Sequence, residues 1–373
     1  MTVESPVRDL AHVRRLVVKV GSSTLADVRV DGFTSRIRAL VERNYQVAIV
    51  TSGAVAYGMS ALGQMQRPRA IAQVQALAAV GQVDLMTEYK AAFARSGVPV
   101  AQILLTHESL SNRQHFLNVR NTLDALFSMG VVPIINENDT VATEELRFGD
   151  NDRLAAAIAT VIDADLVVLL SDIDALYDAD PRVEPTARPI HHVAFIDDDV
   201  RGVAGDVGSR FGTGGMVSKI EAAAIATEAG IPLVIAAGDE PNVLIQLLDG
   251  ELVGTLFAAK AGRPDRRRHW IGHLSKLSGE IHVDGGAANA LRSSSSSLLA
   301  IGVTAVHGAF SKGDGVVILD PEGVQVGMGL AGYDADAMRQ IAGLRSDAVA
   351  VLLGRAAVDP VVHRNDLVVS DEA

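Results

Sequence analysis

The stretch VVPIINENDTVATEELRFGDNDRLAAAIATVI, residues 131–162, decides the fold because it changes from apolar to polar residues and back to apolar ones. It opens with an apolar β-branched run, Val131–Ile135, and closes with an apolar helical pattern, Leu154–Ile162. Asn, Asp and Glu gather between them, at 136–139 and at 150–152, which predicts a strand, a long loop and a helix. Polar groups are then expected at the carboxyl edge of a sheet, where open α/β folds bind ligands. A solvated acidic loop ending in a helix N-cap is the alternative, but two polar groups bracketing one long loop favour function.

Short β-branched runs alternate with longer helical patterns on both sides of this stretch, through the first 259 residues. The expected strands are Leu16–Val20, Val47–Val50, Val98–Leu105, Val131–Asn136, Leu166–Ser171 and Ile231–Ala236. The clearest expected helices are Ala70–Ser96, Phe116–Met129, Leu154–Ile162 and Met216–Ala229. This alternation predicts an α/β fold, a mainly parallel sheet sandwiched by helices. Right-handed crossovers bring the loops that follow the strands to one edge of such a sheet.

After residue 259 the alternation of strand and helix patterns stops. The segment KAGRPDRRRHWIGHLSK, residues 260–276, predicts a basic linker after a first domain of residues 1–259. Short strand-like pieces and Gly-rich turns follow, and they predict a small, mostly β domain over residues 277–355. The last of those strands is expected at Val349–Leu353. Residues 356–373 predict a frayed acidic tail.

Composition limits the possible functions. The 373 residues carry a net charge of −12, which makes nucleic acid an unlikely main partner. The chain has no cysteine, and this excludes disulfides, thiol catalysis and thiolate metal sites. The N-terminus lacks the apolar segment of a signal peptide, and no apolar run is long enough to span a membrane. We therefore expect a cytoplasmic protein.

Two strand ends have the same construction. Lys19 lies inside the first expected strand, one residue before its end, and Gly21 and two serines follow that strand. The second strand is followed by Ser52 and Gly53. A strand-end lysine can contact an anion, and free amides at a helix start can cradle phosphate. A lysine that merely extends to solvent gives the same local pattern, so the interpretation stays open from Lys19 alone.

Two further segments carry phosphate-binding chemistry. Ser171 and Asp172 end a buried strand, where an acidic side chain holds Mg²⁺ or a ribose, or else caps a turn. The segment SRFGTGGMVSK, residues 209–219, places glycines and a hydroxyl before a helix that Lys219 enters early. Glycines, helix-start amides and a lysine are typical of a nucleotide phosphate clamp, although the spacing is not that of a Walker A loop.

A third glycine pattern, in the C-terminal part of the chain, is of the kind that binds dinucleotides. Gly327, Gly329 and Gly332 satisfy the G-x-G-x-x-G dinucleotide fingerprint, with Asp347 twenty residues after Gly327. We expect Asp347 to precede a strand, Val349–Leu353, rather than to end one, and the domain is too small for a pair of βαβ halves. The fingerprint therefore predicts no dinucleotide site.

Taken together, two lysines, Gly-rich helix starts and clustered carboxylates are typical of phosphoryl transfer, which is catalysed mainly by positioning and charge neutralisation. A carboxylate acceptor fits, since it is ionised at pH 7 and needs no general base. Six segments in order, VVKVGSSTL, VTSGAVAYG, INENDTVAT, FGDNDRLAA, LLSDIDALY and FGTGGMVSKIEAA, resemble the amino-acid kinase family, in the branch that phosphorylates glutamate. EIHVDGGAANAL and GYDADAMRQIAG resemble a PUA domain, so the resemblance covers nearly the whole chain. Tyr57 departs from it, where many relatives have a small residue.

The resemblance implies ATP-dependent phosphorylation of the glutamate γ-carboxylate to γ-glutamyl phosphate, the first step of proline synthesis. It implies that Lys19 and Lys219 neutralise the moving phosphoryl group and that Asp152 holds both lysines. It assigns glutamate binding to Ser52, Asp139 and Asn151. It assigns ATP binding to Lys19, Gly21, Ser171, Asp172, Thr213, Gly214, Gly215, Met216, Val217, Ser218 and Lys219. Mg²⁺ would be held mainly by the ATP phosphates.

The resemblance also implies partners. Proline is expected to inhibit in or near the glutamate pocket, and the protein is expected to be a dimer or tetramer. The labile product suggests transfer to glutamate-5-semialdehyde dehydrogenase, the γ-glutamyl phosphate reductase. A related kinase of N-acetylglutamate or aspartate remains an alternative, as does an RNA-binding protein acting through the PUA domain. That domain carries five Lys and Arg against eight Asp and Glu over residues 277–355, which disfavours RNA.

Overall fold

The computed structural model of this chain describes residues 10–142, 151–181, 183–206, 215–260, 277–293, 296–353 and 360–370. The chain divides into two compact units, one of Met1–His107 with Leu117–Arg263 and one of Glu108–Phe116 with Pro264–Ala373. Nearly all of the expected basic linker lies outside the described residues. Within the described ranges, no helix has both the length and the apolar character needed to cross a membrane.

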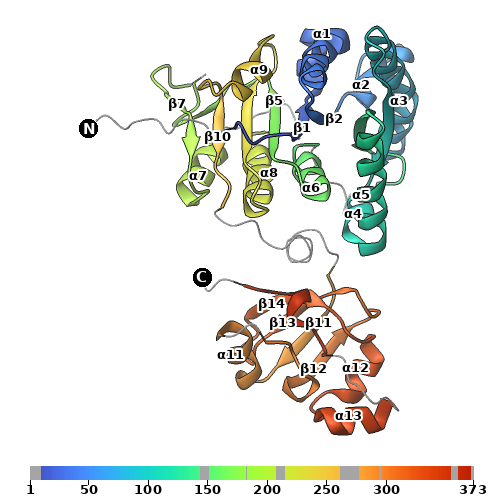
Figure 1. The fold of residues 1–373 in the computed structure, drawn as a ribbon, viewed down its shortest axis with the longest axis vertical. Coiled ribbons are helices and arrows are strands. Elements are labelled where there is room, and N and C mark those ends of the chain that lie inside the picture. Colours follow the sequence, from blue (N-terminus) through green and yellow to red (C-terminus); the bar gives the residue numbers. More distant parts are fainter. Residues whose placement is uncertain are drawn as a thin grey trace. The chain divides into compact units, whose positions relative to one another are not determined.

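The first unit is built on an eight-stranded sheet (Figure 1). Its strands are β1 Arg15–Val20, β2 Gln46–Thr51, β3 Val100–Leu105, β4 Val132–Glu137, β5 Leu166–Ser171, β8 His192–Val193, β9 Leu233–Ala237 and β10 Thr255–Phe257. They lie in the order β3-β4-β2-β1-β5-β9-β10-β8, and only β9 and β10 pair antiparallel. A separate small ribbon joins β6 Leu176–Tyr177 to β7 Pro189–Ile190. The predicted mainly parallel sheet is confirmed.

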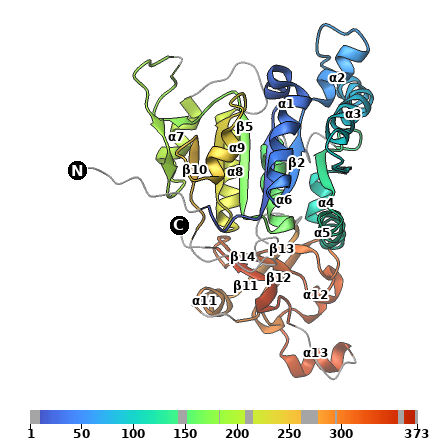
Figure 2. The same ribbon diagram turned by 45° about the horizontal axis from the view of Figure 1, so that its top comes forward.

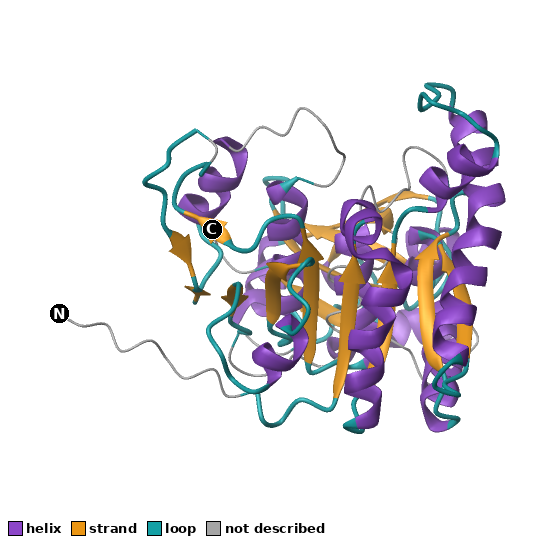
Figure 3. Ribbon diagram, turned by 90° about the horizontal axis from the view of Figure 1, so that it is seen from above, coloured by secondary structure: helices purple, strands orange, loops and turns teal. Residues whose placement is uncertain are grey.

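Helices cover both faces of this sheet (Figure 3). They are α1 Ser22–Glu42, α2 Ala54–Ala61, α3 Ile71–Ala94, α5 Arg113–Ser128, α6 Asn151–Ile162, α7 Asp198–Asp206, α8 Met216–Glu228 and α9 Val243–Leu248. Helix α4, His107–Ser111, belongs almost entirely to the second unit. The four helices named from the sequence are α3, α5, α6 and α8. Helix α6 begins earlier than expected, so Asn151 and Asp152 form its first turn.

Strand alternation decides which side chains reach which helices. In β1, the residues Leu16, Val18 and Val20 pack into one core together with side chains of α1, α3 and α9. Successive strand residues point to opposite faces, so Lys19 lies on the other face of the sheet. Helices α6 and α8 pack against each other on that face, and α6 contacts β1 and β5. This alternation places Lys19 beneath the first turns of α6 and α8.

A close crossing of α2 and α3 fixes α3 over the same sheet edge. A Cβ added to Gly58 would overlap the carbonyl oxygen of Leu77, and one added to Gly81 would overlap the carbonyl oxygen of Ala54. Both glycines are therefore needed for the two backbones to approach. The crossing holds the next residue, Gln82, near the end of β4.

The C-terminal module is mostly β, as predicted, with helices around one sheet (Figure 2). Its strands are β11 Leu277–Val283, β12 Val303–Gly308, β13 Gly315–Leu319, β14 Gln325–Leu330 and β15 Leu367–Val369, in the order β12-β11-β13-β14-β15. Its helices are α11 Gly285–Ser293, η2 Ala300–Gly302, α12 Ala335–Ile341, α13 Ser346–Leu353 and η3 Arg364–Asp366.

Two expectations for this module are wrong. Residues Val349–Leu353 do not form a strand, because they are the second half of α13. A short apolar run cannot be assigned to strand or helix by its periodicity alone. The chain after residue 359 is not a frayed tail, since Val361 and Val362 are buried and Leu367–Val369 forms β15 beside β14.

The same segment explains the glycine fingerprint. Gly327 and Gly329 lie within β14, where a Cβ would overlap the carbonyl oxygen of Val368 and the side chain of Val362 respectively. A Cβ on Gly332 would overlap the carbonyl oxygen of Pro360. These glycines make room for the last strand, so the pattern has a packing cause.

Candidate active site

Three buried charged side chains meet at the carboxyl edge of the sheet, and we call them the charged cluster: Lys19, Asp152 and Lys219. Lys19 Nζ lies 2.6 Å from Asp152 Oδ1, and Lys219 Nζ donates to Asp152 Oδ2 at 2.9 Å. The side chain of Asp152 is fully buried, and those of the two lysines are 8% and 6% exposed. They come from β1 and from the first turns of α6 and α8, elements far apart in the sequence.

The charged cluster carries one more positive than negative charge. Burial alone would raise the pKa of Asp152, but Lys19 and Lys219 outweigh it and hold that pKa below its ordinary value. Asp152 is therefore ionised at neutral pH and fixes both ammonium groups in place. Two ammonium groups held in place at one edge of the sheet are suited to contact an anion there.

Glycines surround this cluster. Gly21 immediately precedes α1, and a Cβ there would lie 3.8 Å from Lys19 Nζ, so the ammonium group lies over that turn. Gly53 precedes α2 with a φ of +107°, a left-handed conformation that favours glycine. A Cβ on Gly53 would lie 3.9 Å from the Cβ of Ser22, so the turns after β1 and β2 adjoin. Gly215 similarly precedes α8.

A neutral chain of polar side chains, which we call the amide network, lies beside the charged cluster. Asn151 Nδ2 is within 2.9 Å of Ser52 Oγ, 2.6 Å of the Thr51 carbonyl oxygen and 3.0 Å of Asn136 Oδ1. Asn136 Nδ2 in turn donates to Gln82 Oε1 at 2.9 Å. The network therefore joins the ends of β2 and β4 to α3 and α6.

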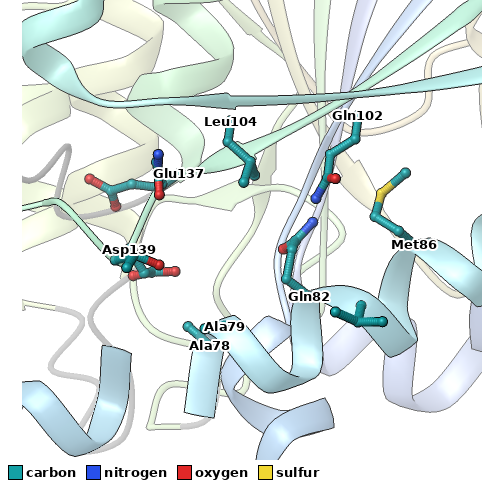
Figure 4. A pocket seen from close by; sticks show the side chains of 11 residues that line it. Ala78, Ala79, Gln82, Met86, Gln102, Leu104, Glu137 and Asp139 are labelled. Atoms are coloured by element: carbon teal, nitrogen blue, oxygen red, sulfur yellow. The ribbon is translucent and has the colours of Figure 1, made fainter. Parts of the chain in front are cut away.

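A cavity of about 430 Å³ adjoins the amide network at Gln82 (Figure 4). Asp139, one of the predicted glutamate-binding residues, lines it together with Glu137 and Asn138 at the end of β4. Its remaining walls come from α3 and from β3, the edge strand of the sheet. The walls are lined by Ala78, Ala79, Gln82, Val83, Met86, Gln102, Leu104, Glu137, Asn138, Asp139 and Thr140.

Ser171 and Asp172 lie at the end of β5, at the same edge. Ser171 Oγ donates to Asp172 Oδ1 at 2.9 Å, and the Ser171 carbonyl accepts from the Gly238 N–H at 2.7 Å. Arg36 of α1 donates to the Gly238 carbonyl at 2.6 Å, and burial lowers the pKa of its guanidinium. Sequence reasoning missed Arg36, although a lone arginine in the apolar stripe of α1 was a signal for it.

The structure brings most of the predicted site residues to one edge of the sheet. Thr213 and Gly214 lie outside the described residues. In the first turn of α8, Met216 is buried, Val217 is exposed and Ser218 is half-buried. Gln82 was not predicted, because nothing in a helical sequence shows which position meets a distant strand end.

Tyr57, the residue that departs from the family pattern, faces α3. Its hydroxyl donates to Glu88 Oε2 at 2.7 Å, and it does not line the cavity. Burial and this hydrogen bond raise its pKa, so the phenol stays neutral. Tyr57 therefore ties α2 to α3.

The chain is similar to known proteins over nearly its whole length. Residues 14–237 match the model of the amino acid kinase family, and residues 279–353 match that of the PUA domain. The glutamate 5-kinase of Thermosynechococcus vestitus is 44% identical over 364 residues, 95% of this chain and 99% of that one. The glutamate 5-kinase of Meiothermus ruber is 45% identical over 363 residues, 96% of each chain. The solved UMP kinase from Bacillus anthracis has a TM-score of 0.48 at 17% identity, covering 67% of this chain and 97% of that chain.

Proposed function

This chain belongs to the amino acid kinase family, and we propose that it transfers the γ-phosphoryl group of ATP to the side-chain carboxylate of L-glutamate. This is the glutamate 5-kinase reaction, the first step of proline biosynthesis. Curated relatives of that name match it over nearly their whole length at 43–45% identity. The structural observation that carries the proposal is the charged cluster, in which one buried carboxylate holds two lysines at the sheet edge.

In the transfer, an oxygen of the glutamate γ-carboxylate forms a bond to the γ-phosphorus. The bond from that phosphorus to the bridging oxygen breaks, and ADP leaves with the electron pair. Lys19 and Lys219 neutralise negative charge on the moving group, and Asp152 keeps the two lysines at a fixed separation. The acceptor is already ionised at neutral pH, so no general base is required.

We assign glutamate and ATP to different residues at the carboxyl edge of the sheet. We assign glutamate to Ser52 and Asn151 in the amide network and to Asp139 in the cavity. ATP is assigned to the glycine turn at Gly21, to Ser171 and Asp172, and to the segment from Thr213 to Lys219. Among the described residues there is no group of three or more His, Cys, Asp or Glu side chains that would hold a metal. As the resemblance implies, we assign Mg²⁺ mainly to the ATP phosphates, where it would supply further charge neutralisation.

The remaining expectations stay predictions. We assign the kinase domain to residues 1–259, the linker to 260–276, the PUA domain to 277–355 and the tail segment to 356–373. Inhibition by proline, assembly into a dimer or tetramer, and transfer of the product to the reductase are likewise expected of this protein.

Hydroxylamine trapping of the acyl phosphate tests the reaction directly. The purified protein is incubated with ATP, Mg²⁺ and either glutamate, N-acetylglutamate or aspartate, each with and without proline. Hydroxamate formed from glutamate alone supports the proposal, and its suppression by proline supports the predicted inhibition. Hydroxamate formed only from another acceptor would overturn the substrate assignment.

A further inference from the structure

The amide network has one possible direction, because a backbone group anchors each end. The carbonyl of Thr51 only accepts, and Asn151 Nδ2 donates to it at 2.6 Å. The N–H of Glu137 only donates, and Asn136 Oδ1 accepts from it at 2.9 Å. The oxygen and nitrogen of a side-chain amide are assigned from their partners, and these backbone partners allow a single assignment.

This direction determines how Gln82 is turned. Since Asn136 Oδ1 faces the Glu137 N–H, Asn136 Nδ2 donates away from it, to Gln82 Oε1. Gln82 Nε2 must then point away from the network. That nitrogen is shielded from solvent, and none of the residues described in the structure accepts a hydrogen bond from it. A buried donor left in this way costs free energy, which a ligand that accepts from it would recover.

The cavity beside Gln82 offers two kinds of partner. Gln82 and Gln102 point toward each other in Figure 4, and the carboxylates of Glu137 and Asp139 lie on the other side of Leu104 in that view. An amide N–H suits a carboxylate ligand, whereas Glu137 and Asp139 suit a cation. An α-amino acid head group carries both an anion and a cation on one carbon.

We propose that Gln82 binds the α-carboxylate of glutamate through Nε2, and that this cavity receives the free amino-acid head group. The inference rests on the proposed function and adds the residue that selects the head group. Asp139 and Glu137 then face the α-ammonium group. An N-acetylated substrate, which lacks this cation, would leave the two carboxylates opposite a neutral amide.

The substitution Gln82→Glu tests the contact. A glutamate side chain retains an oxygen that accepts from Asn136 Nδ2, so the network keeps its direction, but a negative oxygen replaces Nε2. We expect the KM for glutamate to rise about tenfold to a hundredfold, the range of a hydrogen bond to a charged group, with the KM for ATP within about threefold of wild type. Gln73→Glu, at an exposed position of the same helix, is the matched control and should leave both values unchanged.

A second substrate separates a direct contact from a structural effect. Isoglutamine, the α-amide of glutamate, presents an N–H donor where glutamate presents a carboxylate, and it is measured as a substrate or as a competitive inhibitor. We expect the preference for glutamate over isoglutamine to fall at least tenfold in Gln82→Glu, because the new carboxylate accepts from the ligand amide. Loss of packing alone would weaken both ligands equally.

The possible failures are distinguishable. A wild-type protein that forms no acyl phosphate from glutamate would reject the proposed function itself. An active wild type, with the KM for glutamate and the preference unchanged in Gln82→Glu, would reject the role of Gln82 alone. Melting temperatures of both variants show whether a change in KM accompanies unfolding.

Discussion

Asn151 and Asp152 are neighbours in the first turn of α6, yet they belong to two different kinds of site. Asp152 joins the charged cluster, where a fully buried carboxylate lies between two ammonium groups. Asn151 joins the amide network, whose members are neutral and whose direction is set by backbone groups. One helix start therefore supplies one residue to the charged cluster and the next residue to the amide network.

The two regions differ in what the loss of one member does. Removing the Asp152 carboxylate breaks two buried ion pairs at once, which is among the most destabilising changes a protein can suffer. Removing an amide leaves neutral donors and acceptors unpaired, which costs less. We therefore expect the charged cluster to govern stability and kcat, and the amide network to govern the KM for glutamate.

The largest effect is expected from Asp152→Ala. Lys19 and Lys219 would remain buried beside each other with no carboxylate between them, and the free energy of unfolding should fall by about 3–5 kcal/mol. Urea unfolding of the purified variant measures this loss. Asp249→Ala is the matched control, because Asp249 pairs with Arg43 on the surface, and its effect should stay within about 1 kcal/mol. Equal losses of unfolding free energy in the two variants would contradict the prediction that the buried ion pairs of Asp152 stabilise the fold more than a surface ion pair does.

Lys219→Met should act on the reaction more than on the fold. Lys19 and Asp152 remain as a balanced pair, so we expect little change in melting temperature. The kcat should fall about 10²-fold to 10³-fold, the usual result of removing one group that stabilises developing charge. Steady-state kinetics measures this, with Lys90→Met on the exposed side of α3 as the control. A variant that keeps more than about a tenth of the wild-type kcat would remove Lys219 from this role.

Asn151→Ala should give a smaller and different change. Ser52 Oγ and the Thr51 carbonyl lose their donor, and the KM for glutamate should rise about tenfold, equivalent to about 1.4 kcal/mol. The KM for ATP should change much less. Asn118→Ala, at an exposed position of α5, controls for the substitution. A larger change in the KM for ATP than in the KM for glutamate would contradict the assignment of Asn151 to glutamate binding.

The charged cluster was easier to predict from the sequence than the amide network. Lys19, Asp152 and Lys219 were each marked by a local pattern, a strand end or a helix start, and the family resemblance joined them. Strand alternation supplies the physical reason that they meet, because it places Lys19 on the face covered by α6 and α8. Local signals suffice when a parallel sheet gathers its strand ends at one edge.

Neither Gln82 nor Arg36 lies at a strand end or a helix start, and only the apolar neighbours of Arg36 give any signal in the sequence. Each is one polar residue in a long helix, and its partner is a strand end or loop brought near only by packing, through the Gly58 and Gly81 crossing in the case of Gln82. The last strand, Leu367–Val369, was hidden for a related reason, since it pairs with β14 across a long stretch of chain. Contacts between residues distant in the sequence leave little trace in composition or periodicity.

The smallest expected effect is a difference between the charged cluster and the amide network in how acid changes the free energy of unfolding. The folded state holds the pKa of the Asp152 carboxylate below its ordinary value. As the pH falls, this carboxylate is therefore protonated in the unfolded chain before it is protonated in the folded protein. The stabilisation that it gives is present above about pH 4 and is lost as the pH falls through the folded pKa. We expect the gap in unfolding free energy between wild type and Asp152→Asn to shrink between about pH 5 and pH 3. The gap between wild type and Asn151→Ala should stay constant, because no member of the amide network titrates in that range. Urea unfolding at each pH measures both gaps, and a constant gap for Asp152→Asn would show that its carboxylate owes nothing to the two lysines.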